Sequence, residues 1–208
     1  MDYLTIDKEY SYELIVQKSK FISFIFPCSS IEEFQEKYKL IKKKYHDATH
    51  IIPAYRIISE SNIIKEHFSD DREPAKTAGW PVLYILKQKS IVQVGVLVVR
   101  YFGGIKLGTS GLQKAYSEVL LNGIKNANLK PYLKLKEVKI KILIEKEHLI
   151  HEILKNRIND EKIKILNISY FEEKKLNYAL ISLVTDENTI KDLSSLLREK
   201  ISNIEILY

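Results

Sequence analysis

Cysteine is almost absent from this sequence, since Cys28 is the single cysteine among 208 residues. One cysteine cannot form a disulfide within the chain, which excludes a disulfide-stabilised secreted scaffold and favours a reducing, cytoplasmic compartment. Long hydrophobic runs are also absent: runs such as Val94–Val99 extend over six residues, whereas a membrane span needs roughly 18. Met1–Tyr10 carries three acidic residues and no apolar signal-peptide segment, so we expect neither secretion nor membrane insertion.

Glycine is scarce as well, and the positive charge is concentrated in the same part of the chain. Residues 72–134 hold ten basic and two acidic side chains, whereas residues 135–208 hold 13 of each, and the whole chain has a net charge of +6. A basic surface with adaptable backbone favours anionic partners. The seven glycines all lie within 45 residues: Gly79, Gly95, Gly103, Gly104, Gly108, Gly111 and Gly123.

Hydrophobic periodicity predicts a mixed N-terminal domain. Ser30 and Glu33 form a capping box that starts a helix. The apolar stretch ending at Phe102 predicts a central strand. Pro53 predicts that its own strand lies at the edge of the sheet or contains a bulge. The expected elements are strands Tyr10–Lys18, Lys20–Pro27, His50–Ser59 and Ile91–Phe102, helices Ile31–Tyr45, Gly79–Lys87 and Leu112–Ala127, an irregular segment Glu60–Gly79 and a linker Asn128–Lys134.

The C-terminal third alternates more regularly, with the order strand, helix, strand, strand, helix, strand. This order over about 70 residues is typical of the ferredoxin-like split motif. The sequence therefore predicts an α+β protein with two domains, residues 1–131 and residues 135–208. The six expected elements are Val138–Ile144, His148–Ile158, Ile163–Phe171, Tyr178–Thr185, Thr189–Ile201 and Ile204–Leu207.

The polar segment before Gly79 contains three carboxylates within four residues, Asp70, Asp71 and Glu73. Hard oxygen ligands at this spacing could bind Mg²⁺, or they could order the loop and neutralise its basic neighbours. Thr77 can cap the following helix, whose free amide groups would then form an anion site.

A second candidate site follows the predicted central strand. It combines cationic side chains, a glycine-rich turn and hydroxyl groups at a helix start, which suits phosphate binding; the alternative is that the glycines only turn and pack the chain. No Walker A loop, dinucleotide-binding fingerprint or nucleophile elbow is present, and we expect Ser110 to be a helix cap. The predicted phosphate-binding residues are Arg100, Gly103, Gly104, Lys106, Thr109, Ser110 and Lys114, with Arg72 and Lys76 alongside.

Among the remaining reactive or aromatic residues, the aromatic ones have two interpretations. Trp80, Tyr101 and Phe102 lie beside the basic segments, where they could stack on bases or pack in the core. The histidines do not form a metal-binding spacing with one another or with Cys28, which we expect to be buried and inert.

Two motifs together resemble the IMPACT/YigZ family. They are D-D-x-E-P-x-x-T-A-G at Asp70–Gly79 and R-Y-F-G-G-I-K-L-G-x-x-G-L at Arg100–Leu112, and Lys18–Ile22 and Ala115-Tyr116 also fit. The resemblance implies an N-terminal domain like the second domain of small-subunit ribosomal protein five and a C-terminal ferredoxin-like domain like one in elongation factor G. It also implies a link to translation, because the eukaryotic relatives compete for the activator of a stress-responsive kinase of an initiation factor.

This sequence departs from the family pattern in its first motif. The family usually reads D-D-G-E-P-S-G-T-A-G, whereas Arg72, Ala75 and Lys76 stand at three of those places. Two glycines and a hydroxyl are replaced and two positive charges are gained, which favours a role in attracting anions.

We therefore expect a cytoplasmic, translation-linked regulatory protein that binds RNA or the ribosome and is not an enzyme. No cofactor is predicted. One alternative is an enzyme acting on a phosphorylated small molecule or nucleotide, with Mg²⁺ held by the Asp/Glu loop. The other is a module that recruits a protein partner through the C-terminal domain.

Overall fold

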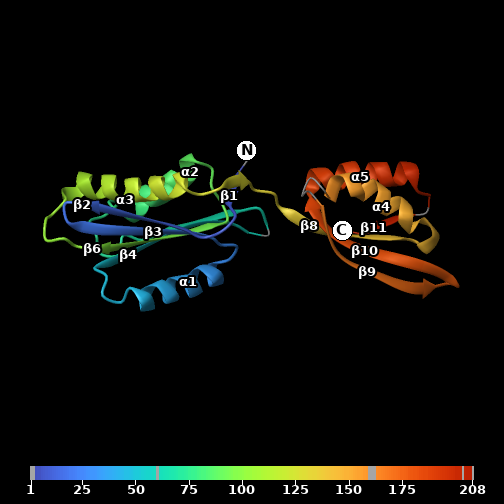
Figure 1. Ribbon diagram of the computed structural model, residues 1–208, viewed down its shortest axis with the longest axis horizontal. Helices are drawn as coiled ribbons and strands as arrows, with labels where there is room; N and C mark the ends of the chain where they lie inside the picture. The colour runs from blue at the N-terminus through green and yellow to red at the C-terminus, as the bar shows by residue number, and fades with distance from the viewer. Residues whose placement is uncertain (1–2, 60, 159–162, 203, 208) are drawn as a thin grey trace. The chain divides into compact units, whose positions relative to one another are not determined.

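The computed structural model describes residues 3–59, 61–158, 163–202 and 204–207. The chain divides into two compact units, Met1–Tyr132 and Leu133–Tyr208 (Figure 1). Each has its own hydrophobic core, and both combine a β-sheet with helices, which confirms the predicted α+β class.

The N-terminal unit is built on a five-stranded sheet in which all neighbouring strands are antiparallel. β6 is the central strand and is buried along almost all of its length, as its β-branched, apolar sequence predicts. In spatial order the strands are β2 (Tyr10–Val16), β3 (Ser19–Pro27), β6 (Val94–Tyr101), β4 (His50–Ile58) and β5 (Ile64–Phe68).

Helices cover both faces of this sheet (Figure 1). α1 (Ile31–Lys44) lies on one face, and α2 (Gly79–Gln88) and α3 (Gly108–Lys125) lie on the other. The central strand alternates between two cores: Val94, Val96 and Val98 pack beneath α2 and α3, and Leu97 and Val99 pack beneath α1. The predicted cap is present, because the Glu33 amide donates to the Ser30 hydroxyl at 3.1 Å.

Four details differ from the sequence-based expectation. β5 lies in the segment expected to be irregular, and β7 (Leu129–Pro131) lies in the expected linker, where it pairs with β1 (Leu4–Ile6). α3 begins at Gly108, four residues earlier than predicted. β4 is an interior strand and not the edge strand that Pro53 suggested. Because β5 pairs only with the second half of β4, the ladder partner at Pro53 is β6 alone.

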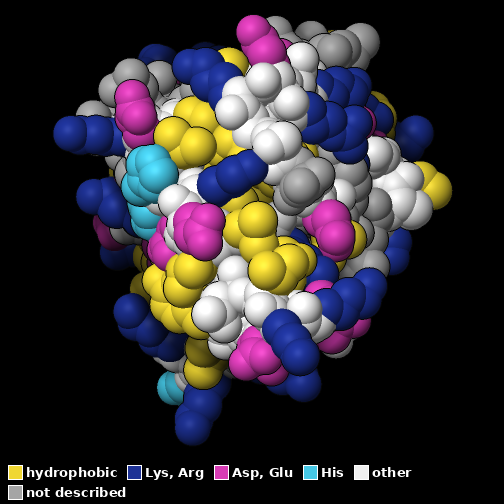
Figure 2. Space-filling view, turned by 90° about the vertical axis from the view of Figure 1, so that its right-hand side faces the viewer, with side chains coloured by type: hydrophobic (Ala, Val, Ile, Leu, Met, Phe, Trp, Pro, Cys, Tyr) yellow, Lys and Arg dark blue, Asp and Glu magenta, His cyan; other side chains and the backbone are white. Residues whose placement is uncertain are grey.

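The C-terminal unit has the predicted β-α-β-β-α-β order. Its sheet has the strand order β11-β8-β10-β9, with α4 and α5 on one face (Figure 1). The other face carries Phe171 and Tyr178, whose rings stack at 5.7 Å, and half-exposed Leu207. Figure 2 shows surface hydrophobic side chains interspersed with charged ones. The elements are β8 (Leu135–Leu143), η1 (Ile144–Lys146), α4 (Glu147–Ile158), β9 (Ile163–Glu173), β10 (Leu176–Asp186), α5 (Glu187–Lys200) and β11 (Glu205–Leu207).

Candidate functional site

The glycine-rich segment after β6 lies at one end of the N-terminal sheet, where β2 ends and β3 and β4 begin. The Gly103 amide donates to the Ser19 hydroxyl at 3.1 Å, and the Phe102 amide donates to the Thr49 hydroxyl at 3.0 Å. In Figure 1 this end, with the β2–β3 turn and the loop from β6 to α3, lies on the left of the unit.

Three glycines of this segment have a structural role. A Cβ atom at Gly103 would lie 2.0 Å from the carbonyl carbon of Lys18, so the two backbones approach too closely for any side chain. Gly104 and Gly108 have φ angles of +85° and +70°, which L side chains rarely adopt. These glycines turn the chain tightly, whether or not a phosphate also binds there.

Asp70 organises the loop that carries the first motif. Its carboxylate accepts hydrogen bonds from the amides of Lys76 (2.8 Å), Ala78 (3.1 Å) and Gly79 (2.8 Å). The start of α2 is thus capped by Asp70. This corrects the prediction for Thr77, whose hydroxyl donates to the Pro74 carbonyl at 2.7 Å. It also removes the anion site expected there, because these amides are already bound.

Asp71 fastens the same loop to the sheet. Its carboxylate accepts a hydrogen bond of 2.8 Å from the Ile51 amide, and its carbonyl oxygen lies 2.7 Å from Nδ1 of His50. Both contacts are to the first residues of β4, so the loop closes over the end of the sheet.

Glu73 and Arg100 form a buried ion pair, with 9% and 5% of their surfaces exposed. Oε1 of Glu73 also accepts a hydrogen bond of 2.8 Å from the Tyr116 hydroxyl. Burial raises the pKa of Tyr116, and the neighbouring Glu73 charge raises it further, so the phenol stays a protonated donor. The Arg100 guanidinium lies 5.4 Å from the Phe21 ring centre and 5.6 Å from that of Phe102.

Arg100 is therefore not the surface phosphate ligand that its position beside the glycines predicted. It continues the alternation of Val96 and Val98, so its side chain points into the core beneath α3. The charge is retained there because Glu73 neutralises it.

The three carboxylates do not fit a Mg²⁺ site. Asp70 binds three amides, Asp71 binds the Ile51 amide, and Glu73 binds Arg100 and Tyr116. Across residues 3–59, 61–158, 163–202 and 204–207, no group of three or more His, Cys, Asp or Glu side chains is placed to hold a metal ion. The carboxylates order the loop, which was the other role predicted for them.

Four predicted cations do reach solvent: Arg72, Lys76, Lys106 and Lys114, which we call the basic rim. The Gln113 side chain donates to the Lys76 carbonyl at 3.2 Å, so the two motif segments meet where α3 begins.

The hydroxyl groups expected in the second motif are also exposed, those of Thr109 and Ser110. Ser110 is not a cap, because α3 begins at Gly108 with Leu107 at the N-cap position and no capping side chain. The first turn of α3 carries no acidic residue. Its positive dipole end is thus uncompensated.

The aromatic residues beside these segments divide into exposed and structural ones. Trp80 and Phe102 are 38% and 46% exposed, whereas the hydroxyl of half-buried Tyr101 donates to Asp47 at 2.8 Å. Cys28 is buried, and burial, with the nearby Glu33 charge, raises the pKa of its thiol to about 12, in line with an inert role.

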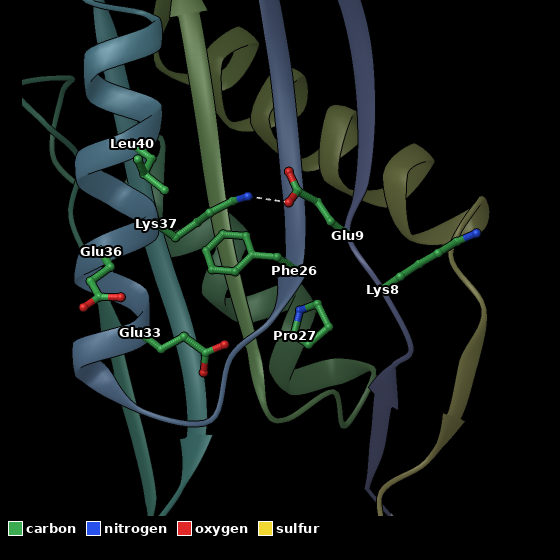
Figure 3. A pocket seen from close by; sticks show the side chains of 8 residues that line it. All are labelled: Lys8, Glu9, Phe26, Pro27, Glu33, Glu36, Lys37 and Leu40. Atoms are coloured by element: carbon green, nitrogen blue, oxygen red, sulfur yellow. Dashed lines mark hydrogen bonds and ion pairs between the residues drawn. The ribbon is translucent and has the colours of Figure 1, made fainter.

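Two surface pockets lie on the α1 side of the unit, away from the predicted residues. The larger, about 420 Å³, lies between α1, the end of β3 and the segment before β2 (Figure 3). Lys37 and Glu9 form an ion pair there, and the lining mixes both charge signs, which matches no particular anion. The smaller, about 260 Å³, contains Tyr55, whose ring stacks on that of His67. None of the described helices is long and apolar enough to cross a membrane.

Sequence reasoning gave no role to Tyr116 and His50, although both contact the loop that carries Asp70, Asp71 and Glu73, which we call the acidic loop. A signal existed for Tyr116. It lies four residues after Leu112, on the inward face of its helix, where a hydroxyl requires a hydrogen-bond partner.

Comparison with known proteins identifies the family. The model of the Impact N-terminal domain matches residues 17–124. The chain is 39% identical over 122 residues to the IMPACT family member YvyE of Bacillus subtilis, covering 59% of this chain and 55% of that protein. It is 36% identical over 143 residues to an IMPACT family member of Thermus thermophilus, covering 69% and 75% respectively. The matched segment thus spans only about half the length of the Bacillus relative.

A solved structure shows that the fold is shared over both units. The crystal structure of a hypothetical protein superposes with a TM-score of 0.65 and covers 99% of this chain and 96% of its own, at 23% identity. The domain match, which includes both motifs, and the Thermus relative together decide the assignment: the chain belongs to the IMPACT family.

Proposed function

We propose that this protein is a translation-linked, cytoplasmic regulator that binds RNA or the ribosome through the basic rim. The observation that carries the proposal is the exposed positive charge of the basic rim at one end of the N-terminal sheet, where only Arg72 of the four described cations forms an ion pair. Membership of the IMPACT family supports the link to translation. The motif resemblance implies this link, because it points to eukaryotic relatives that regulate translation.

The nearby acidic residues neutralise only part of this charge. Of the two acids in residues 72–134, Glu73 is buried with Arg100 and Glu118 is half-buried. Among the described residues, Lys76, Lys106 and Lys114 take part in none of the ion pairs, and Arg72, with its side chain 82% exposed, lies 3.8 Å from Asp71. Four cations thus face solvent around the start of α3.

This arrangement suits a polyanion better than a small acidic metabolite. Lysine and arginine side chains bind phosphates and release condensed counterions, which provides most of the affinity for nucleic acid without base contacts. Thr109 and Ser110 add hydroxyl donors, and the uncapped amides of α3 favour negative charge. The rim is spread over two segments, so it can contact several phosphates of one strand.

The enzymatic alternative has no support in the geometry. It requires free carboxylates for Mg²⁺, and those of Asp70, Asp71 and Glu73 accept hydrogen bonds from the protein itself.

A protein partner at the open face of the C-terminal sheet is a second proposal, favoured by exposed Phe171 and Leu207. Leu207→Glu places a charge on this face. It is expected to reduce recovery of such a partner with the tagged full chain, and unchanged recovery would refute the proposal.

The test of RNA or ribosome binding uses the full chain, labelled RNA and sedimented ribosomes at several salt concentrations. We expect binding that weakens as salt rises. The double variant Lys106→Ala, Lys114→Ala should flatten the plot of log affinity against log salt by about 0.7 for each lost phosphate contact to a single strand.

Lys42→Ala with Lys43→Ala is the matched control, because these exposed lysines end α1, where the helix dipole explains them. The control should bind like the unaltered protein. Binding that is absent, insensitive to salt, or equally reduced by both double variants would contradict the proposal.

A further inference from the structure

The exposed side of α2 carries an aromatic cluster that phosphate binding by the basic rim does not use. Trp80 and Tyr84 lie one helical turn apart, 38% and 47% exposed, with their ring centres 6.2 Å from each other. The Trp80 ring also lies 5.7 Å from the ring of Phe68 at the end of β5. We call Phe68, Trp80 and Tyr84 the aromatic stack.

The stack is held by the fold and is not a set of loose surface rings. Phe68 packs against the core beneath α2 and α3. The start of α2 is pressed against the residue that follows β5, since a Cβ atom at Gly79 would lie 2.5 Å from the Ser69 carbonyl oxygen. Rings that are already ordered lose little conformational freedom when a flat ligand stacks on them.

The aromatic stack adjoins the basic rim. The carboxylate of Asp70 accepts from the amide of Lys76 in the rim and from that of Gly79, the residue before Trp80. The Lys76 carbonyl in turn accepts from Gln113, one residue before Lys114. The aromatic stack thus adjoins the basic rim at Lys76, and Lys76 is linked in turn to the α3 end of the rim.

We propose that the aromatic stack binds unpaired bases while the basic rim binds the adjoining phosphates, so that the ligand is single-stranded RNA. The inference rests on the proposed function and specifies its substrate class. Bases in a duplex are stacked on one another and present only their edges, whereas unpaired bases are free to stack on tryptophan and tyrosine. The cations of the basic rim favour RNA over an apolar protein partner.

Trp80 is the single tryptophan of the chain, so its fluorescence reports on this surface alone. The experiment titrates the full chain with a single-stranded RNA of about 12 nucleotides, and with a duplex of the same length. We expect the single strand to quench the fluorescence and to bind more tightly than the duplex.

Variants separate stacking from charge. Trp80→Ala and Tyr84→Ala, measured by anisotropy of labelled RNA, should each lose about tenfold in affinity for the single strand. The salt dependence should stay unchanged, because no phosphate contact is removed. Tyr170→Ala is the matched control, since Tyr170 is 58% exposed on the C-terminal unit. Thermal unfolding shows whether each variant is folded, and Tyr84→Ala provides the test should Trp80→Ala fail to fold.

The outcomes distinguish this inference from the function on which it rests. Salt-dependent RNA binding with unquenched Trp80, with equal or greater affinity for the duplex, or with full affinity in folded Tyr84→Ala would overturn the stacking role and leave RNA binding in place. No binding of either RNA would overturn both. Quenching of Trp80 by a protein without any quenching by RNA would assign the stack to a protein partner and also refute the inference.

Discussion

The Tyr116 hydroxyl donates a hydrogen bond of 2.8 Å to Oε1 of Glu73, which also receives the guanidinium of Arg100. All three side chains are buried, so removing the carboxylate would leave an unpaired cation in the core. We expect Glu73→Ala to lower the free energy of unfolding by about 3–5 kcal/mol and Tyr116→Phe by about 1–3 kcal/mol. Urea denaturation followed by circular dichroism measures both.

The control for this pair is Glu36→Gln on the exposed side of α1, which should change stability by less than about 0.5 kcal/mol. An unchanged urea midpoint for Glu73→Ala would show that the buried ion pair of Glu73 and Arg100 does not stabilise the acidic loop. Arg100→Ala belongs with this test of stability and not with tests of RNA binding, because its guanidinium does not reach the surface.

Cys28 supplies a pH-dependent prediction. Its thiol has a raised pKa of about 12, against an ordinary value of 9.0, chiefly through burial. Since the pKa in the folded state is the higher one, the unfolded chain loses the proton first as pH rises. The stability due to the neutral thiol is complete below about pH 9 and is lost between about pH 9 and pH 12. Cys28→Ala should therefore lose less stability than the unaltered chain between pH 8 and pH 10.5 in urea titrations. Equal losses would contradict the assigned burial.

The elements that sequence predicts well are those whose pattern and packing agree. The apolar run through Val94–Val99 fits a strand buried on both faces, and the Ser30–Glu33 cap marks the start of α1. β5 was missed because its sequence, Ile64–Phe68, is largely polar. It is ordered by β4, where Arg56 binds Glu66 at 2.9 Å, a contact between distant positions that local pattern does not contain.

In the candidate site, local sequence likewise does not show which cationic side chain is neutralised by a distant carboxylate. Sequence identifies Arg100 and Lys106 as cations but does not say which of them is neutralised. The strand alternation places Arg100 with Val96 and Val98, and its partner Glu73 lies 27 residues away, on a loop without regular structure. The three-dimensional position of that loop, and with it the distinction between a core cation and a surface cation, depends on contacts made by Asp70 and Asp71.

Gly103 and Gly104 allow two causes of glycine preference to be separated. A Cβ at Gly103 would lie 2.1 Å from the Lys18 carbonyl oxygen, so Gly103→Ala must move the backbone of the β2–β3 turn or of the segment after β6 and should cost about 2 kcal/mol or more. Gly104 has open space around it and only its φ of +85° to oppose a side chain, so Gly104→Ala should cost about 1 kcal/mol. Thermal unfolding of the two variants checks the order. A larger loss for Gly104→Ala would contradict the close approach of Gly103 to Lys18.

Lys76 stands where the family usually has glycine, and its φ of +59° is one that glycine adopts more easily. Lys76→Gly should therefore raise stability by up to about 1 kcal/mol, while Lys76→Ala, which keeps the strained backbone, should not. Both variants remove the same charge from the basic rim, so both should weaken RNA binding equally and flatten its salt dependence. Urea denaturation and RNA titration of the matched pair separate the two effects. If the glycine variant bound RNA like the unaltered protein, the lysine would serve neither the backbone nor the ligand, and the gain of charge at this position would have no part in recognition.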